Sequence, residues 1–299
     1  MGPAASTAFA VIARLTQNSA ELLPVKVDNQ DHMSRAAKIF PVPAESGSVL
    51  LYEQPLNERM RTFLRLEFLY TQLNYHTAQQ SAWSSRGAVS SLLDIVAILS
   101  RGDVRGDVLK ELERQIFVLE RLQRTVEIDA DRLDKILSSL RTQRSDLNAL
   151  GPKYLQELRD SEFLNAVRHR SSIPGGTCAF DLPEYTHWLR QGFERRSNDI
   201  SRWITVVQPL CESVIALLWM LRNSKQPNKQ LAINGVYQHA LNRDNTSALI
   251  RITLPGNSAI YPEISGGQHR FSVRLMQWNA SESRPEQIRH DVEFELAVC

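Results

Sequence analysis

The chain has 299 residues with 42% hydrophobic content, 35 basic and 33 acidic side chains, and a formal net charge of +2. This length can bury a sizeable core and fits about two domains, which excludes a wholly disordered chain. The near-neutral charge excludes a whole-molecule field that would by itself favour nucleic-acid binding. The three cysteines are odd in number, lie far apart and form no CxxC motif. The sequence therefore indicates neither a disulfide framework nor a zinc site and favours a reducing cytoplasm.

Residues 1–48 are expected to form a disordered leader outside the folded part of the chain. They mix Ala, Pro, Ser and Asn with little sustained periodicity, and Pro41, Pro43 and Gly47 mark their end. No membrane span is expected, because the longest apolar run covers only the eight residues 214–221, whereas about 20 are needed to cross a bilayer.

Residues 49–226 are predicted to form a helical domain. Asn57 is a favourable N-cap for a first helix whose apolar residues recur three and four apart. A second apolar stripe precedes Gly102, which is placed to take the left-handed cap conformation, and Asp103 is placed to cap the next helix. Further helices are predicted near residues 108–122, 133–140, 162–170, 185–189 and 198–223. The last of these has the widest apolar stripe, and Pro209 is expected to kink it.

Residues 227–299 are predicted to form a β-rich domain packed on the helical domain. Asn234-Gly235 is a hairpin signal, and residues 250–254, 271–275 and 292–298 alternate between apolar and polar side chains. This pattern predicts a small antiparallel sheet with one buried face. The predicted fold class is therefore α+β, a helical bundle followed by a β-rich unit.

Motifs for catalysis are weak. Cys178 could be activated as a nucleophile by His169 or His187, but a cysteine more often packs as a small hydrophobic residue, and Cys211 is expected to lie in the core. The Gly-rich stretches 174–176 and 265–267 do not continue as phosphate-binding loops, and the histidines lack metal-ligand spacing. The sequence predicts no enzyme, no cofactor and no metal site.

Arginines on the predicted strand 269–277 indicate a different kind of site. Alternation sends Phe271, Val273 and Leu275 inward, so Arg270 and Arg274 project together from the outer face, possibly beside Arg251 on a neighbouring strand. One interpretation is pairing within the protein with the outward-facing Glu293 and Glu295. The other is a surface that binds an acidic peptide or another carboxylate-bearing partner.

Several stretches, taken together, resemble the ZapD family of bacterial cell division proteins. They are residues 52–69 (YEQPLNERMRTFLRLEFL), 101–105 (RGDVR) with 109–112 (LKEL), 172–176 (SIPGG) with 180–183 (FDLP), 234–235 (NG), 261–266 (YPEISG), 270–274 (RFSVR) and 294–299 (FELAVC). No single motif would suffice, but they occur in one order across about residues 50–299. The leader 1–48 lies outside the family pattern.

The resemblance implies a cytoplasmic, non-enzymatic homodimer that acts at the mid-cell division site. Proteins of this family bind the C-terminal tail of the tubulin-like FtsZ and bundle its protofilaments, which promotes assembly of the Z-ring. The implied FtsZ-binding residues are Arg65, Arg101, Arg270 and Arg274, to which we add Arg251, Arg168 and His187. Glu162 and Thr186 depart from the family pattern, which uses a basic residue and a histidine there, and Arg168 and His187 lie close enough to substitute. The resemblance implies no membrane partner.

A nucleic-acid-binding module is the alternative. It would use the Arg-rich outer face of the sheet together with the clusters Arg168-His169-Arg170 and Arg195-Arg196 to contact phosphates. The near-neutral net charge argues against it, so no nucleic-acid partner is expected.

Overall fold

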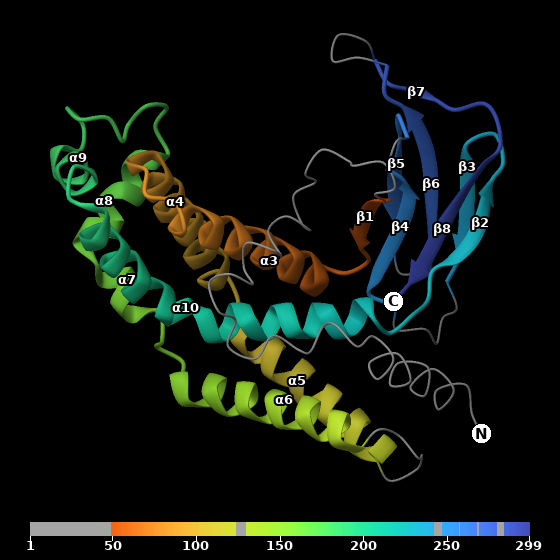
Figure 1. Ribbon diagram of the computed structural model, residues 1–299, viewed down its shortest axis with the longest axis horizontal. Helices are drawn as coiled ribbons and strands as arrows, with labels where there is room; N and C mark the ends of the chain where they lie inside the picture. The colour runs from red at the N-terminus through yellow and green to blue at the C-terminus, as the bar shows by residue number, and fades with distance from the viewer. Residues whose placement is uncertain (1–48, 124–129, 242–246, 257, 268, 280–283) are drawn as a thin grey trace. The chain divides into compact units, whose positions relative to one another are not determined.

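The computed structural model describes residues 49–123, 130–241, 247–256, 258–267, 269–279 and 284–299. The leader predicted for residues 1–48 lies outside them. The described chain divides into two compact units (Figure 1). The helical unit comprises residues 65–217, and the β unit comprises residues 49–64 together with 218–299.

The helices follow the predicted apolar periodicity. They are α3 (Glu58–Thr77), α4 (Ala82–Leu99), α5 (Val104–Gln123), α6 (Ala130–Leu150), α7 (Gln156–Asp160), α8 (Glu162–Ser171), α9 (Pro183–Leu189) and α10 (Phe193–Arg222). Helices α5 and α6 lie side by side as a hairpin (Figure 1). Their facing stripes bury Leu112, Ile116 and Leu119 of α5 and Leu133, Leu137 and Leu140 of α6. This burial is the main force that holds such a pair together.

Side-chain caps determine where several helices begin. Asn57 Oδ1 accepts a hydrogen bond from the Met60 amide at 2.8 Å, and Asp103 Oδ1 accepts one from the Gly106 amide at 2.9 Å. Both predicted N-caps are therefore confirmed. The prediction for Gly102 is wrong, because its φ is not positive. Helix α4 instead ends in ordinary right-handed conformation at Ser100, whose amide bonds back to the Val96 carbonyl.

Two helices, α4 and α10, are long and apolar enough to pass a membrane-span test based on length and composition. Averaged over 18 residues, their hydropathies reach 1.2 and 1.8, and half of each window is buried inside the protein. Core helices of globular proteins meet the same criterion, so this property carries no argument for a span. Pro209 lies within α10, where Ser213 donates a hydrogen bond to the Pro209 carbonyl at 2.7 Å.

The β unit contains two antiparallel sheets (Figure 1). The first, sheet A, has the order β1-β4-β8-β2, and the second, sheet B, has the order β3-β6-β5 with β7 also paired to β6. The strands are β1 (Val49–Pro55), β2 (Asn228–Ala232), β3 (Val236–Ala240), β4 (Leu249–Pro255), β5 (Ile260–Gly266), β6 (Arg270–Gln277), β7 (Glu286–Gln287) and β8 (Val292–Val298). The predicted α+β fold class is confirmed, but the strands form two sheets where the alternation predicted one.

One apolar core joins the two sheets of the β unit. It includes Ile250, Ile252 and Leu254 of β4 and Phe271, Val273 and Leu275 of β6, all at most 2% exposed. These are the residues whose alternation with polar neighbours predicted strands. Each sheet therefore has one apolar face inward, as in other two-layer β structures.

The Asn234-Gly235 turn forms as predicted but connects different sheets. Asn234 has φ 50° and Gly235 has φ 73°, and the Val236 amide bonds to the Ile233 carbonyl at 3.0 Å. Positive φ at both central residues is the mark of a type I′ turn. The preceding strand β2 then pairs with β8, whereas the following strand β3 pairs with β6.

Strand β1 is absent from the sequence prediction, which placed residues 49–226 in the helical domain. Residues Val49–Pro55 pair along their whole length with β4, from Val49 opposite Pro255 to Pro55 opposite Leu249. The inward face of β1 carries Leu50 and Tyr52, which pack against the core of the β unit. A seven-residue strand separated from its partner by nearly 200 residues leaves only a weak local signal.

Candidate peptide-binding surface

The outward direction of Arg270 and Arg274 is confirmed. Both side chains are exposed on β6, while the intervening Phe271 and Val273 are buried. Opposite residues in an antiparallel pair share a face, so Glu263 and Ser265 of β5 lie on the same outer face of sheet B. We call this surface, with Arg270, Arg274, Glu263, Tyr261 and Trp278, the outer face of sheet B.

Arg274 has a weak ionic partner on the neighbouring strand. Its Nη2 lies 3.2 Å from Glu263 Oε2, and the two side chains are 59% and 46% exposed. Exposed pairs contribute only about 0–1 kcal/mol, so the guanidinium can exchange this partner for another carboxylate at little cost. Arg270 has no ionic partner among the residues that the structure describes.

The proposed pairing of these arginines with Glu293 and Glu295 is wrong. Both glutamates lie on β8 in sheet A, where Glu293 is opposite Leu231, and Glu295 is opposite Lys229 and Thr253. Alternation gives the direction of a side chain but not which sheet its strand joins.

The placement of Arg251 beside Arg270 and Arg274 is also wrong. Arg251 lies on β4 in sheet A, with a side chain only 22% exposed. It donates to Glu53 Oε1 at 3.0 Å and to the Arg222 carbonyl at 3.0 Å. Arg251 thus serves the internal structure of the β unit.

The remaining candidates belong to the helical unit. Arg65 on α3, Arg101 just after α4, Arg168 on α8 and His187 on α9 all have exposed side chains. His187 Nε2 lies 3.0 Å from Gln191 Nε2. Of the two positions that depart from the family pattern, Glu162 is exposed in the first turn of α8 and Thr186 is half-buried on α9.

Some arginines of the clusters proposed for phosphate binding already bind other groups within the protein. Arg196 is buried and donates to Ser85 Oγ at 3.0 Å, to the Gln80 carbonyl at 2.8 Å and to the Gln191 carbonyl. Arg170 lies 3.6 Å from Asp181. With Arg196 buried and Arg251 paired, the nucleic-acid alternative loses two of its contacts.

The described cysteines show no catalytic pairing. Cys178 Sγ donates to Asp181 Oδ2 at 3.5 Å, so its polar neighbour is a carboxylate where a nucleophile would need a base such as histidine. Cys211 is fully buried as predicted, and burial raises the pKa of its thiol well above the ordinary value.

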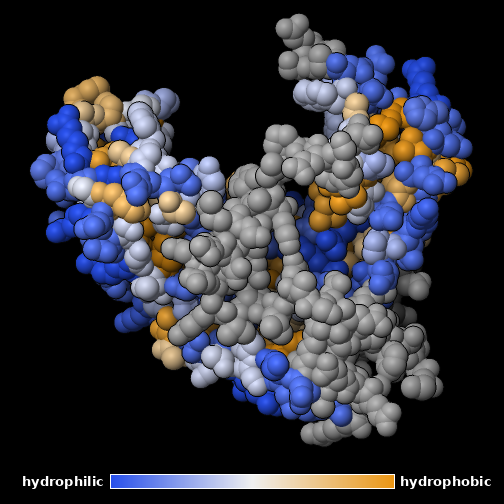
Figure 2. Space-filling model, viewed as in Figure 1, coloured by the Kyte–Doolittle hydropathy of each residue, from blue (hydrophilic) through white to orange (hydrophobic). Residues whose placement is uncertain are grey.

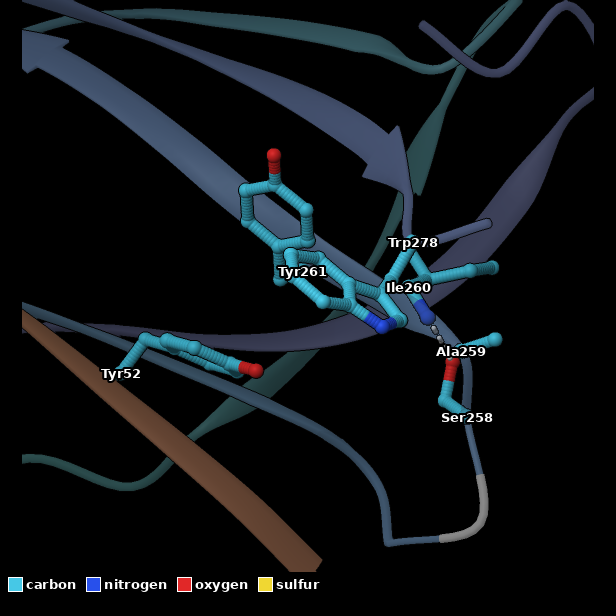
Figure 3. A pocket seen from close by; sticks show the side chains of 6 residues that line it. All are labelled: Tyr52, Ser258, Ala259, Ile260, Tyr261 and Trp278. Atoms are coloured by element: carbon cyan, nitrogen blue, oxygen red, sulfur yellow. Dashed lines mark hydrogen bonds between the residues drawn. The ribbon is translucent and has the colours of Figure 1, made fainter. Parts of the chain in front are cut away.

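A pocket of about 550 Å³ opens in the β unit (Figure 3). Its walls are Tyr52 of β1, Ser258 and Ala259 before β5, Ile260 and Tyr261 of β5, and Trp278 directly after β6. Three aromatic residues therefore line a pocket between edge strands of the two sheets, β1 and β5. This pocket is absent from the sequence prediction, because Tyr52 comes from a segment not expected to be a strand.

Hydrophobic side chains also gather between hydrophilic ones on the visible face of the β unit (Figure 2). Exposed apolar residues in this unit include Val49 and Leu51 of β1 and Trp278, which is 55% exposed. Of these, Trp278 follows β6, the strand that carries the exposed Arg270 and Arg274, and an aromatic group combined with exposed arginines is typical of surfaces that bind peptides.

Comparison with known proteins identifies relatives along most of the chain. A family model described as "ZapD: Cell division protein" matches residues 64–274. A protein of Methylococcus capsulatus is 36% identical over 250 residues, covering 84% of this chain and 98% of that relative. A protein of Ralstonia pickettii is 37% identical over 252 residues, and one of Enterobacter sp. is 36% identical over 254 residues. All three carry the name "Cell division protein ZapD".

Proposed function

The chain belongs to the ZapD family of cell division proteins, and from this premise we propose that it is a non-enzymatic factor that binds the C-terminal tail of FtsZ and cross-links FtsZ protofilaments. The observation that carries the proposal is the pair Arg270 and Arg274 on the outer face of sheet B. One guanidinium has no ionic partner in the described structure, and the other has only an exposed one.

Carboxylates of a flexible tail are suitable partners for this pair. Guanidinium groups bind carboxylates through charge-assisted hydrogen bonds, which are stronger than neutral ones. A short tail that becomes ordered on binding loses conformational entropy, so we expect each contact to be weak. Arg65, Arg101, Arg168 and His187 of the helical unit are proposed as further contacts with the same tail.

Cross-linking would come from two tail sites in a homodimer. Once one tail is bound, attachment of a second becomes effectively intramolecular, so weak sites suffice to hold two protofilaments together. Bundled filaments exchange subunits more slowly, and FtsZ would then turn over less GTP. In the cell, the protein would act in the cytoplasm at the division site and depend on FtsZ for its position there.

Sedimentation of FtsZ with GTP tests this function. We expect pelleted bundles when the full-length chain is added, and none when FtsZ lacks its C-terminal tail. Arg274→Glu should abolish co-pelleting, whereas Arg202→Glu on the exposed surface of α10 should not. Bundling of tail-less FtsZ, or the absence of any response from intact filaments, would overturn the proposal.

A further inference from the structure

We infer that the aromatic pocket of Tyr52, Tyr261 and Trp278 receives an apolar side chain of the same acidic peptide that binds Arg270 and Arg274. This inference rests on the proposed function and assigns a second determinant of specificity to that site. The peptide would be recognised by two chemistries, carboxylates at one end of β6 and a hydrophobic anchor at the other.

The geometry of β6 places Trp278 on the same face as the two arginines, and Tyr52, which packs against the core from β1, lines the pocket from sheet A. Residues 270, 274 and 278 have the same parity along an extended chain, and the Trp278 amide still bonds to the Ala259 carbonyl at 2.8 Å. Pairing with β5 therefore continues through Trp278, and its side chain follows the direction of the two arginines. On β5, Tyr261 is opposite Met276, two positions from the pair formed by Glu263 and Arg274.

This arrangement predicts a spacing within the peptide. Arg274 and Trp278 are four positions apart along the chain, which is about 13 Å at about 3.3 Å per residue. A peptide extended over the outer face of sheet B in the direction of β6 would reach the pocket with a side chain about four residues from the carboxylate that meets Arg274. A carboxylate that meets Arg270 would be about four residues farther along.

Hydrogen bonds within the chain hold one wall of the pocket in place. The Ile260 amide donates to Ser258 Oγ at 3.1 Å (Figure 3), and the Ser258 amide donates to the Pro255 carbonyl at 3.0 Å. These bonds fix the residues that lead into β5, where Ser258 and Ala259 form one wall. A preformed wall spares the binding partner part of the cost of ordering it.

The exposure of the pocket favours a tethered side chain over a free small molecule. Trp278 is 55% exposed and Ala259 is also exposed, so a small ligand would keep much of its surface in water. Pockets for small molecules usually bury most of their ligand. A side chain on a peptide already held by arginines needs less burial, because its attachment is intramolecular.

Fluorescence anisotropy of a labelled FtsZ tail peptide, titrated with the full-length chain, tests the inference. We expect Trp278→Ala to weaken binding by about 10- to 30-fold, as for an aromatic hot spot, and Trp278→Phe to recover part of this loss. The matched control is Trp83→Ala on α4, which removes an aromatic side chain 79% exposed in the other unit and should change binding less than 2-fold. Unchanged circular dichroism and melting would establish that each variant is folded.

Two further readouts separate the anchor from the arginines. The loss of affinity in Arg274→Glu should be electrostatic, so the ratio of its Kd to the wild-type Kd should fall at high salt. The corresponding ratio for Trp278→Ala should be nearly independent of salt. Alanine substitution along the peptide should reveal one apolar position whose loss has no further effect in Trp278→Ala, the mark of direct coupling.

The outcomes distinguish the two proposals. If Arg274→Glu weakens binding and Trp278→Ala does not, the pocket inference is overturned and the proposed function stands. If the wild-type chain binds no tail peptide, the proposed function fails and the inference fails with it. If Trp83→Ala weakens binding as much as Trp278→Ala, the effect is not specific to the pocket and the inference is also overturned.

Discussion

Glu53 on β1 accepts a hydrogen bond from Arg222, the last residue of α10, at 2.6 Å, although 169 residues separate them in the sequence. The same carboxylate accepts from Arg251 on β4 at 3.0 Å. All three side chains are about four-fifths buried. The cluster therefore joins the first strand, the last helix and the centre of sheet A.

Glu53→Gln should destabilise the β unit. The substitution leaves two guanidinium groups without their shared charge in a partly buried site, which should cost about 2 kcal/mol of unfolding free energy. Denaturation by urea measures this. Glu120→Gln removes a carboxylate from the exposed pair with Arg141 and should cost less than about 0.5 kcal/mol. Equal losses in the two variants would show that the cluster contributes no more than a surface pair.

Arg251→Ala should lower stability, whereas Arg270→Ala should weaken binding without lowering stability. Arg251→Ala breaks the contact with Glu53 and should lower the melting temperature by several degrees. Arg270→Ala should leave the melting temperature unchanged, because its side chain is exposed and has no ionic partner in the described structure, yet weaken binding of the FtsZ tail severalfold. Calorimetry and peptide titration measure the two effects. Normal tail binding by Arg270→Ala would remove it from the site.

Gly235→Ala should be strongly destabilising. The glycine has φ 73°, and a Cβ there would lie 2.3 Å from the Ile288 carbonyl oxygen, so backbone would have to move. We expect a loss of about 2 kcal/mol or more in unfolding free energy. Gly102→Ala is the matched control, because its φ is not positive and nothing lies within 4 Å of the added carbon. That variant should be neutral or slightly stabilising. Similar behaviour of the two would contradict the close approach at Ile288.

Thiol labelling should single out Cys178. It is the half-buried cysteine, whereas Cys211 and Cys299 are buried and burial raises the pKa of both thiols. Since the thiolate is the reactive form, both should stay unmodified at neutral pH until the protein unfolds. Mass spectrometry after timed labelling locates the modified residue. Cys178→Ser should leave FtsZ bundling intact. Loss of bundling in this variant would favour the catalytic interpretation again.

Local sequence patterns predicted most of the fold and, in the candidate site, the outward direction of two arginines. The spacing of three and four predicted the helices, and the N-caps at Asn57 and Asp103 form as expected. Alternation was enough to place Arg270 and Arg274 outward, because it depends only on immediate neighbours. The family resemblance stated from the sequence is likewise confirmed by the comparisons.

Relations between distant segments could not be derived in this way. Nothing near Arg251 in the sequence indicates that Glu53 would be its partner, and nothing near Trp278 indicates Tyr52. Both depend on β1 pairing with β4, a long-range choice made by the packing of the whole unit. The predicted position of Arg251 beside Arg270 and Arg274 is therefore wrong, and the aromatic pocket is absent from the sequence prediction.

The Asn234-Gly235 turn has a consequence for the outer face of sheet B. Its two residues tie β2, which is in register with β8, to β3, which is in register with β6. A slip of one residue between β3 and β6 would exchange inward and outward side chains, and the short connection would force a compensating slip in sheet A. The register of each sheet thus constrains the register of the other. The outward direction of Arg270 and Arg274 therefore depends also on the pairing of β2 with β8, in which neither arginine takes part.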